Sequence, residues 1–216
     1  MVAKALDAAR ALQVAILLFD EVEVLDFAGP FEVFGVARSG ADEPAFEVVT
    51  VALQPDPVFA RNSLQVIPSF GAADFRRADI LVIPGGPGTR LEMKDSRMLE
   101  FVRDASASVE VTLSVCTGAL LLGSAGVLQG RGATTHWAAM TELEALDCGA
   151  ALYPGARVVD NGSLVVCAGV SAGIDGALYV VERLLGRPQA AAAARAMEYD
   201  WSAPDQGRGL VVHNAD

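Results

Sequence analysis

Histidine and cysteine are scarce in this sequence of 216 residues. The two histidines are His136 and His213, and the three cysteines are Cys116, Cys148 and Cys167. The cysteines are odd in number, widely spaced and include no CxxC pair, which argues against a disulfide framework. So few ligating side chains, without metal-ligand spacing, also give no indication of a zinc site.

Positive charge and long apolar runs are scarce as well. Lys and Arg number 16 against 27 Asp and Glu, so the formal net charge is −11. This charge repels phosphate backbones and anionic lipid surfaces, so we expect neither nucleic acid nor membrane as a partner. No run approaches the roughly 18 uninterrupted apolar residues of a membrane span, and the first residues lack an apolar signal core. A cytoplasmic protein is therefore expected.

Hydrophobic residues make up 52% of the sequence and charged residues 20%, which is typical of a chain that buries a sizeable core. The length suits one large domain or two small ones, but no internal repeat and no linker divides the chain. We therefore expect a single domain over residues 1–216.

Short runs of branched apolar residues predict buried strands at 13–19, 46–53, 78–86 and 110–116. The run at 64–70 is predicted as an edge strand or hairpin arm, because Pro68 lacks a backbone donor for a ladder. Helical spacing or composition appears between these strands. The first predicted helix begins near Pro30 and stops at Gly40, with Phe31, Val33 and Phe34 on one face. A second helix is predicted over 91–107. A third is predicted over 117–130, closed by Gly126 or Gly130.

The segment 157–170 has two branched runs around Asn161-Gly162, which is a strong hairpin signal. A helix ending at Gly186 should follow, and Pro188 opens another through the alanine-rich segment. Strands that alternate with helices indicate a parallel sheet covered on both faces. The predicted fold class is α/β: a flavodoxin-like three-layer sandwich with a mostly parallel central sheet, helices on both faces and a small antiparallel hairpin.

In such a sheet, ligands bind beyond the carboxyl ends of the strands, so residues at strand-to-helix turns are candidates for a site. Cys116 lies in SVCTG at 114–118, between a predicted strand and a predicted helix, like the serine of a nucleophile elbow. Helix N-terminal amides there are expected to lower the pKa of its thiol. The alternative is that Cys116 is simply a small buried residue.

Two further turns carry candidate residues. Asp26, in VLDFAGP, follows the first strand, and it reads either as an acid/base group or as a helix-capping carboxylate. In PGGPG, Gly85, Gly86 and Pro87 form a turn whose amides could approach a ligand or a developing oxyanion, although such a turn is often only a tight turn. The turn lacks the sequence of a phosphate-binding loop.

Together these motifs resemble the ThiJ/PfpI superfamily, which has the class I glutamine-amidotransferase-like fold. The resemblance spans nearly the whole chain, from LLFDEVEVLDFAGPFEVF through ILVIPGGPG and SVCTGALLLGSAGVLQGRGATTHW to GVSAGIDGAL and AMEYD. Within the superfamily, these motifs are most similar to those of isonitrile hydratases. This likeness implies a lyase of the hydro-lyase type, in which Cys116 is the nucleophile and Asp26 and Thr117 are also required.

The resemblance also suggests roles for neighbouring residues. Amides of the turn at 85–87, with Thr117, would orient the adduct and a water molecule, and no metal or organic cofactor is required. His136 in ATTHW matches a histidine near the site in several relatives, but a structural role is the more common one. Cys148 and Cys167 read as packing residues, and His213 lies in a segment expected to fray.

Some departures from the superfamily narrow the function. Peptidase-like members have CHG where this chain has Thr117 after the cysteine, so a peptidase is not expected. Related sensor halves of AraC-type regulators continue into a helix-turn-helix domain, which we do not expect here. Asn62 stands where relatives commonly have glycine or serine, and the last residues lack the proline-rich ending common in the hydratases. These differences leave the substrate open.

Other functions of the same cysteine stay open: a glyoxalase, deglycase or amide hydrolase, or a redox or small-molecule sensor in which Cys116 is oxidised. The partner expected in every enzymatic case is a small-molecule substrate. The resemblance also implies a homodimer, to which the apolar Phe27, Phe31 and Phe34 could contribute, although a helix facing the core would look the same.

Overall fold

An eight-stranded, mostly parallel sheet organises the computed structural model, which describes residues 10–39, 43–203 and 209–213. The strand order is β12-β10-β11-β7-β6-β1-β2-β5. All neighbours pair in parallel except β10 and β11, which form an antiparallel hairpin. The strands of this sheet are β1 (Leu12–Leu17), β2 (Phe46–Ala52), β5 (Phe70–Gly71), β6 (Ile80–Ile83), β7 (Val111–Val115), β10 (Val158–Asp160), β11 (Leu164–Cys167) and β12 (Leu210–Val212).

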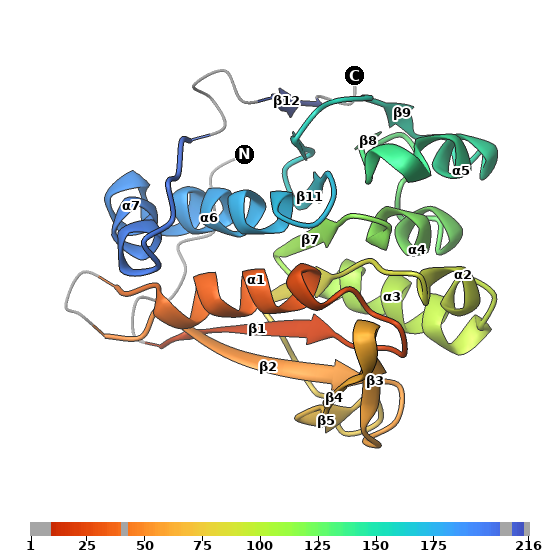
Figure 1. Cartoon of the computed structure of the whole chain (residues 1–216), viewed down its shortest axis with the longest axis horizontal. Coiled ribbons are helices and arrows are strands. Elements are labelled where there is room, and N and C mark those ends of the chain that lie inside the picture. The colour runs from red at the N-terminus through yellow and green to blue at the C-terminus, as the bar shows by residue number, and fades with distance from the viewer. Residues whose placement is uncertain (1–9, 40–42, 204–208, 214–216) are drawn as a thin grey trace.

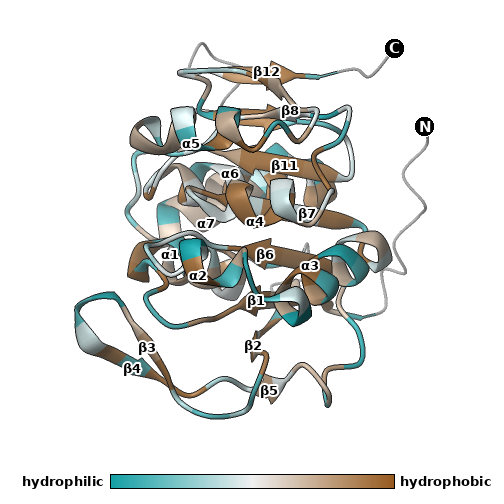
Figure 2. Cartoon of the chain, turned by 90° about the vertical axis from the view of Figure 1, so that its right-hand side faces the viewer, coloured by the Kyte–Doolittle hydropathy of each residue, from teal (hydrophilic) through white to brown (hydrophobic). Residues whose placement is uncertain are grey.

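Helices cover both faces of the sheet (Figure 1). One layer contains α1 (Val24–Val36), α6 (Ala172–Leu185) and α7 (Arg187–Ala196), which contact one another. The other layer, which faces the viewer in Figure 2, contains α2 (Thr89–Glu92), α3 (Ser96–Ser108), α4 (Gly118–Ser124) and α5 (Met140–Ala145). The predicted α/β class, with its parallel sheet and helices on both faces, is confirmed. Among the described residues, no helix is both long enough and apolar enough to cross a membrane.

The centre of the sheet supplies the core, because its strands are covered by helices on both faces. Every residue of β6, β7 and β11 is buried, as is all of β1 except Gln13. Such continuous apolar runs are typical of parallel strands that are shielded on both sides. The runs predicted at 13–19, 46–53, 78–86 and 110–116 all contain a strand of this sheet.

The predicted hairpin around Asn161-Gly162 is confirmed by β10 and β11, and Gly162 adopts a left-handed φ of 80° at the turn. The run predicted at 64–70 divides into two parts. β4 (Leu64–Val66) pairs with β3 (Val58–Ala60) in a second antiparallel hairpin, whereas β5 is an edge strand beside β2.

Gly186, with a φ of 97°, ends α6 as predicted, and Pro188 lies in the first turn of α7.

The first helix starts and ends earlier than the sequence predicts. α1 begins at Val24 rather than near Pro30, so Pro30 lies inside it, and it ends at Val36 before the predicted stop. Gly40 lies outside the described residues. Proline costs the helix one backbone donor, but burial of an apolar face against the sheet outweighs that loss. Val33 and Phe34 are fully buried, whereas Phe31 is 43% exposed and does not share their face.

The predicted helix at 91–107 is two helices. α2 ends at Glu92, and α3 starts anew behind Asp95, whose carboxylate accepts a hydrogen bond from the Arg97 amide. Leu91 is 72% exposed instead of lying on the core face of a continuous helix. α4 ends at Ser124, six residues before Gly130, and Gly126 takes a left-handed φ of 78° just after it.

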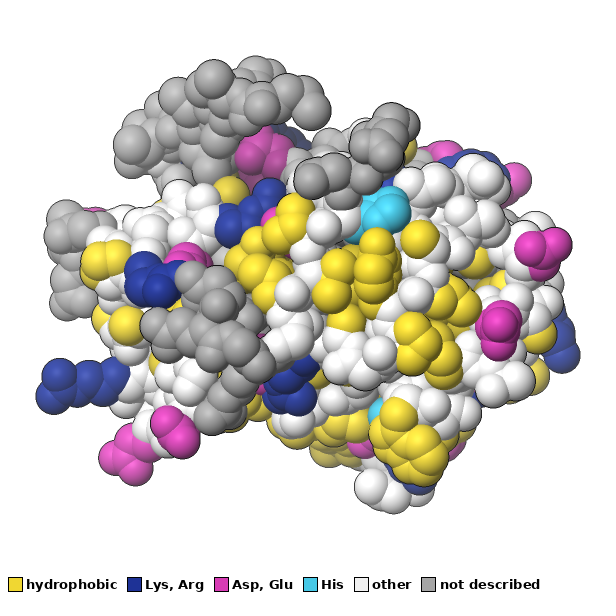
Figure 3. All heavy atoms as spheres, turned by 90° about the horizontal axis from the view of Figure 1, so that it is seen from above, with side chains coloured by type: hydrophobic (Ala, Val, Ile, Leu, Met, Phe, Trp, Pro, Cys, Tyr) yellow, Lys and Arg dark blue, Asp and Glu magenta, His cyan; other side chains and the backbone are white. Residues whose placement is uncertain are grey.

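The end of the described chain was also wrongly predicted to fray. β12 extends the sheet beside β10, the His213 amide donates to the Asp160 carbonyl, and the His213 ring hydrogen-bonds the Tyr153 hydroxyl at 2.9 Å. Figure 3 views this side of the molecule, where hydrophobic side chains gather with few charged ones between them. A short parallel ladder of β8 (Gly132–Ala133) and β9 (Ala151–Leu152) lies near this side and was not predicted.

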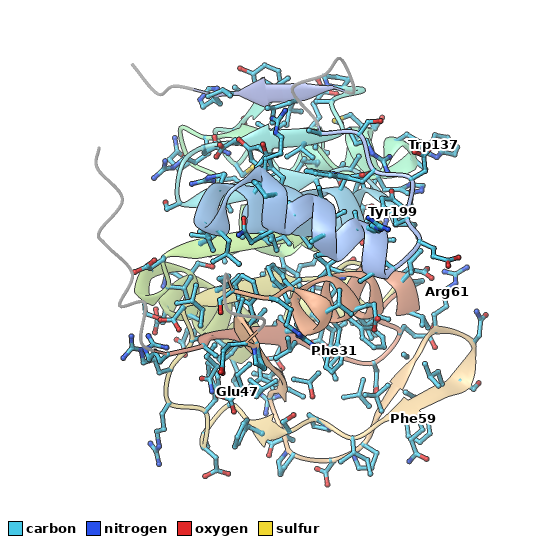
Figure 4. All side chains as sticks on the ribbon, turned by 90° about the vertical axis from the view of Figure 1, so that its left-hand side faces the viewer. Phe31, Glu47, Phe59, Arg61, Trp137 and Tyr199 are labelled. Carbon is cyan, nitrogen blue, oxygen red and sulfur yellow. The ribbon has the colours of Figure 1, made fainter. Side chains whose placement is uncertain are left out.

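The homodimer stays a prediction. Of the three aromatic residues considered for it, Phe27 and Phe34 are buried within the chain and only Phe31 is substantially exposed (Figure 4).

Asp79 joins the amino-terminal ends of three central strands. Its amide donates to the Gln13 carbonyl, its own carbonyl accepts from the Glu110 and Val111 amides, and its carboxylate accepts from the Gln13 amide at 2.8 Å. The guanidinium of Arg10 hydrogen-bonds the same carboxylate, which is the largest reason why the pKa of Asp79 falls to about 2.

We expect Asp79→Asn to lower the free energy of unfolding at pH 7 by about 1–2 kcal/mol, after discounting for the exposed arginines. Because the folded pKa is depressed, this stabilisation is present above the unfolded value near 4 and is lost as the pH falls towards 2. Urea unfolding across this range should therefore show the gap between wild type and variant closing. Asp104→Asn, at a 75% exposed side chain, is the control. A gap that stays constant with pH would contradict this role.

Candidate active site

Cys116 occupies a tight turn between β7 and α4, as predicted. Its backbone is left-handed, with a φ of 58°, which is uncommon outside glycine. Neighbouring segments hold this backbone in place: the Cys116 amide donates to the Ala168 carbonyl at 3.0 Å, and the Thr135 hydroxyl donates to the Cys116 carbonyl at 2.8 Å. The residue is only 6% exposed, but it lines a cavity. This is the arrangement of a nucleophile elbow.

Asp26 is a fully buried carboxyl in the first turn of α1, and it is not a helix cap. The capping position is Glu23, and no side chain caps this helix end. Instead, Asp26 Oδ2 accepts a hydrogen bond from the Gly85 amide at 2.9 Å. Asp26 Oδ1 has no hydrogen-bond partner among the residues that the structure describes, although the carboxyl and the Cys116 thiol perturb each other's pKa. The structure therefore brings together the two residues that the sequence singled out.

Thr117 and Gly86 form a reciprocal pair beside the cysteine. The Gly86 amide donates to Thr117 Oγ1 at 2.9 Å, and the same hydroxyl lies 3.1 Å from the Gly86 carbonyl as its donor. Thr89 adds a second hydroxyl donor to that carbonyl at 2.8 Å. Thr117 thus anchors the turn of residues 84–88 against the elbow.

These contacts correct the predicted oxyanion role of Gly85, Gly86 and Pro87. The Gly85 amide is taken by Asp26 and the Gly86 amide by Thr117, while proline has no amide proton. Space explains the glycine at position 85, because a Cβ atom there would lie 2.5 Å from the Thr117 nitrogen and 2.9 Å from Asp26 Oδ2. The glycines allow the turn to approach the carboxyl closely, and they do not supply free donors.

Burial is the main cause of the proton affinities of the pair. Burial is the largest cause that raises the pKa of Asp26 to about 7, against the lowering effects of the Gly85 amide and the Cys116 side chain. Burial, followed by the negative charge of Asp26, raises the pKa of the Cys116 thiol to about 12. The expectation of a lowered thiol pKa is therefore wrong. The pair loses its first proton near neutral pH and holds its second one up to high pH.

The amides of Thr117 and Val170 are the donors that favour a negative charge on the Cys116 sulfur, because both lower the pKa of the thiol. Val170 also has a left-handed backbone, with a φ of 49°. A β-branched residue rarely adopts this conformation, so the fold constrains it there. Sequence reasoning missed Val170 and Thr135, although both lie within or next to the motifs that carried the resemblance.

His136 borders the cysteine pocket from the segment before α5. Its Nδ1 accepts a hydrogen bond from the Ala138 amide at 3.2 Å, which leaves Nε2 to carry the proton in the neutral ring. The ring crosses close to Gly169, where a Cβ atom would lie 2.2 Å from His136 Cδ2. His136 therefore lies at the site, as the sequence suggested, with a structural hydrogen bond of its own.

Two adjoining cavities meet at His136 and Val170. The smaller, of about 280 Å³, contains Cys116 and Thr117, and it is also lined by Arg61 and Arg90. The larger, of about 1070 Å³, is an open groove that includes Trp137, which is 84% exposed. Figure 4 shows Arg61, from the β3–β4 hairpin, and Trp137 at the same edge of the molecule. No sequence pattern indicated Arg61 or Arg90, because a lone arginine in a predicted loop has no characteristic spacing.

A thiol in an elbow at the carboxyl end of a parallel sheet, facing a buried carboxyl, defines a class of cysteine proteins with an α/β sandwich. The pattern of the DJ-1/PfpI family matches residues 12–183, and the chain belongs to this family.

Individual relatives agree with this assignment. The chain is 37% identical to isonitrile hydratase from Pseudomonas putida, over 95% of this chain and 89% of that protein. It is 28% identical to protein/nucleic acid deglycase 2 from Escherichia coli, over 71% of this chain and 86% of that protein. Among solved structures, a ThiJ/PfpI family protein from Pseudomonas syringae superimposes with a TM-score of 0.78 at 32% identity, covering 92% of this chain and 84% of the other.

The coupling between the two groups predicts how Cys116 reacts. Because the negative charge of Asp26 raises the pKa of the thiol, Asp26→Asn should lower that pKa and speed alkylation by iodoacetamide at pH 8–9. Mass spectrometry of the labelled peptide measures the rate at Cys116, and Cys116→Ala gives the background from the half-buried Cys148. Slower alkylation in a folded Asp26→Asn variant would show that the carboxylate acts on the thiol in some other way.

Proposed function

We propose that this chain hydrates isonitriles to N-substituted formamides, with Cys116 as nucleophile and Asp26 as the group that moves protons. The observation that carries the proposal is the pairing of a thiol in a strained elbow with a buried carboxyl whose pKa is about 7. A carboxyl with that pKa can accept and return a proton at neutral pH. The likeness to isonitrile hydratase over nearly the whole chain supports the choice of substrate.

The first step forms a carbon–sulfur bond. The Asp26 carboxylate takes the thiol proton, and the sulfur attacks the terminal carbon of R–N≡C. Asp26 then returns the proton to that carbon, which gives the thioimidate Cys116–S–CH=N–R. The amides of Thr117 and Val170, which favour negative charge on the sulfur, stabilise it while the proton is absent.

The second step consumes water. Asp26 accepts a proton from a water molecule whose oxygen adds to the thioimidate carbon, and that proton passes to the nitrogen. The tetrahedral adduct then expels the sulfur, which recovers its proton, and releases HC(=O)–NH–R. The sum is one isonitrile and one water to one formamide, and no oxidant or reductant is needed. His136, beside the cavity, contacts the substrate or limits its access.

A second candidate function, removal of small carbonyl adducts, is favoured by the likeness to protein/nucleic acid deglycase 2. The same thiol could attack a carbonyl carbon, and lactate formation from methylglyoxal would reveal such chemistry. A redox sensor is less well supported, because oxidation follows the thiolate and a pKa of about 12 keeps Cys116 a thiol at neutral pH.

Purified protein should convert cyclohexyl isocyanide to N-cyclohexylformamide. Because Asp26 must be ionised to take the thiol proton, kcat/KM should rise about tenfold per pH unit below the Asp26 pKa of about 7 and level off above it. Formamide detected by gas chromatography measures the rate, with a known hydratase run alongside. If the known hydratase is active and this protein is not, isonitrile hydration is excluded, whereas lactate from methylglyoxal would favour the second candidate.

Three substitutions separate the roles within the site. Cys116→Ala should abolish turnover, and Asp26→Asn should reduce it about 10²–10⁴-fold while the melting temperature stays close to wild type. His136→Ala should cost less than either, with any loss tracking loss of stability. Asp175→Asn is a control, because Asp175 is a buried carboxyl that pairs with Arg157 and not with the cysteine. A fully active Asp26→Asn protein would require another acid.

A further inference from the structure

A third cavity, of about 470 Å³, lies at the opposite end of β7 from Cys116. Its walls come from the last turns of α3, the turn that follows α4 and the start of β11. Thr112 lies in the cavity and Cys116 follows the same strand, four residues on. At about 3.3 Å per residue they are roughly 13 Å apart, so this cavity is separate from the site described above. Figure 2 shows α3 and α4 on the same face of the sheet.

Two hydroxyl groups in this cavity lack hydrogen-bond partners. Thr112 Oγ1 and Ser106 Oγ are both shielded from solvent, and neither has a partner among the residues that the structure describes. Thr112 as a whole is only 2% exposed. An unpaired buried hydroxyl is destabilising, and native proteins contain few of them. A ligand would satisfy both hydroxyls if their side chains rotated toward the cavity, because neither oxygen reaches its surface in the present rotamer.

The charged residues that line the cavity are both arginines. Arg103 has one contact with the exposed Asp104, at 3.2 Å, and Arg131 has one long contact with the Asn161 carbonyl, at 3.4 Å. Each guanidinium therefore keeps donors available for a further acceptor. Among the described residues that line the cavity there are two arginines and no carboxylate, although Asp104 beside it pairs with Arg103.

The ends of two helices oppose the binding of an anion in this cavity. α3 and α4 both end at this cavity, and each helix C-terminus carries a partial charge of about −0.5. Asp104 offsets the charge of Arg103, so the charge of Arg131, which forms no ion pair with the described residues, is what balances the two helix ends. The rest of the lining is largely apolar, including Ala107, Val127 and Leu164. An inorganic ion alone would leave this apolar part of the cavity unfilled.

We propose that this cavity binds a small organic oxyanion, a phosphate or carboxylate attached to a compact apolar group. The oxyanion accepts hydrogen bonds from Arg103, Arg131 and the hydroxyls of Thr112 and Ser106, and the apolar group lies against the alanine, valine and leucine side chains. Guanidinium groups recognise both head groups through the same paired donors. Binding here does not depend on the chemistry of Cys116.

The test is calorimetric titration of the full chain at constant ionic strength, so that charge screening is the same throughout. Phenyl phosphate and benzoate carry the two head groups, and benzyl alcohol is the neutral counterpart. We expect saturable binding of at least one anion and none of the alcohol. Arg131→Gln and Arg103→Gln should each weaken binding at least tenfold, whereas Arg76→Gln, at an exposed arginine before β6, should not change it.

Thr112 gives the sharpest variant. Thr112→Val replaces the unpaired hydroxyl with a methyl group of similar size, so the melting temperature without ligand should stay the same or rise, while anion affinity falls at least tenfold. Thr112→Ser keeps a hydroxyl and should keep binding. The proposal is overturned if neither anion binds, if benzyl alcohol binds as tightly, or if the arginine and valine variants bind as well as wild type does.

Discussion

The hydrogen bond from the Gly85 amide to Asp26 Oδ2 is the contact on which the candidate site depends. It joins the first turn of α1 to the loop after β6, and Thr117 then joins that loop to the cysteine elbow. Three segments that are far apart in the sequence thereby share one buried network. Buried polar networks of this kind are stable only when nearly every donor is satisfied. Here the unsatisfied atom is Asp26 Oδ1, on the carboxyl that interacts with the thiol.

Burial also explains why the reactive pair behaves differently from an isolated cysteine at a helix end. α4 contains only seven residues, so its N-terminal amides offer limited stabilisation, while desolvation and the nearby carboxylate both oppose ionisation of the thiol. The result is a site in which the proton stays on the sulfur at neutral pH while the carboxyl titrates. A thiol held in this way is protected from ionisation in water at neutral pH.

Much of the fold could be read from the sequence, because periodicity and turn chemistry are local. The apolar runs of the central strands, the Asn161-Gly162 hairpin and the Gly186 stop all have local signals. The start of α1 has no such local signal, because burial of the apolar side chains of Phe27, Val33 and Phe34 outweighs the preference for Pro30 in a first turn. β12 is three residues long and depends on pairing with β10, which no local pattern reveals. In the site, Cys116, Asp26 and Thr117 lie in recognisable motifs, whereas the occupied amides of Gly85 and Gly86 depend on contacts between distant segments, which no local pattern reveals.

The candidate site has a crowded part around Gly86, where side chains have no space, and an exposed part that contains Arg61 and Trp137. A Cβ atom at position 86 would lie 2.4 Å from the Glu21 carbonyl oxygen, and the Gly86 amide and carbonyl are already engaged. Amino-acid substitutions at Gly86 are therefore sterically disfavoured. Arg61, on an exposed hairpin beside the left-handed Asn62, and the exposed Trp137 are under no such constraint. Under the proposed function, substrate preference can change at these two positions while Cys116 and Asp26 stay as they are.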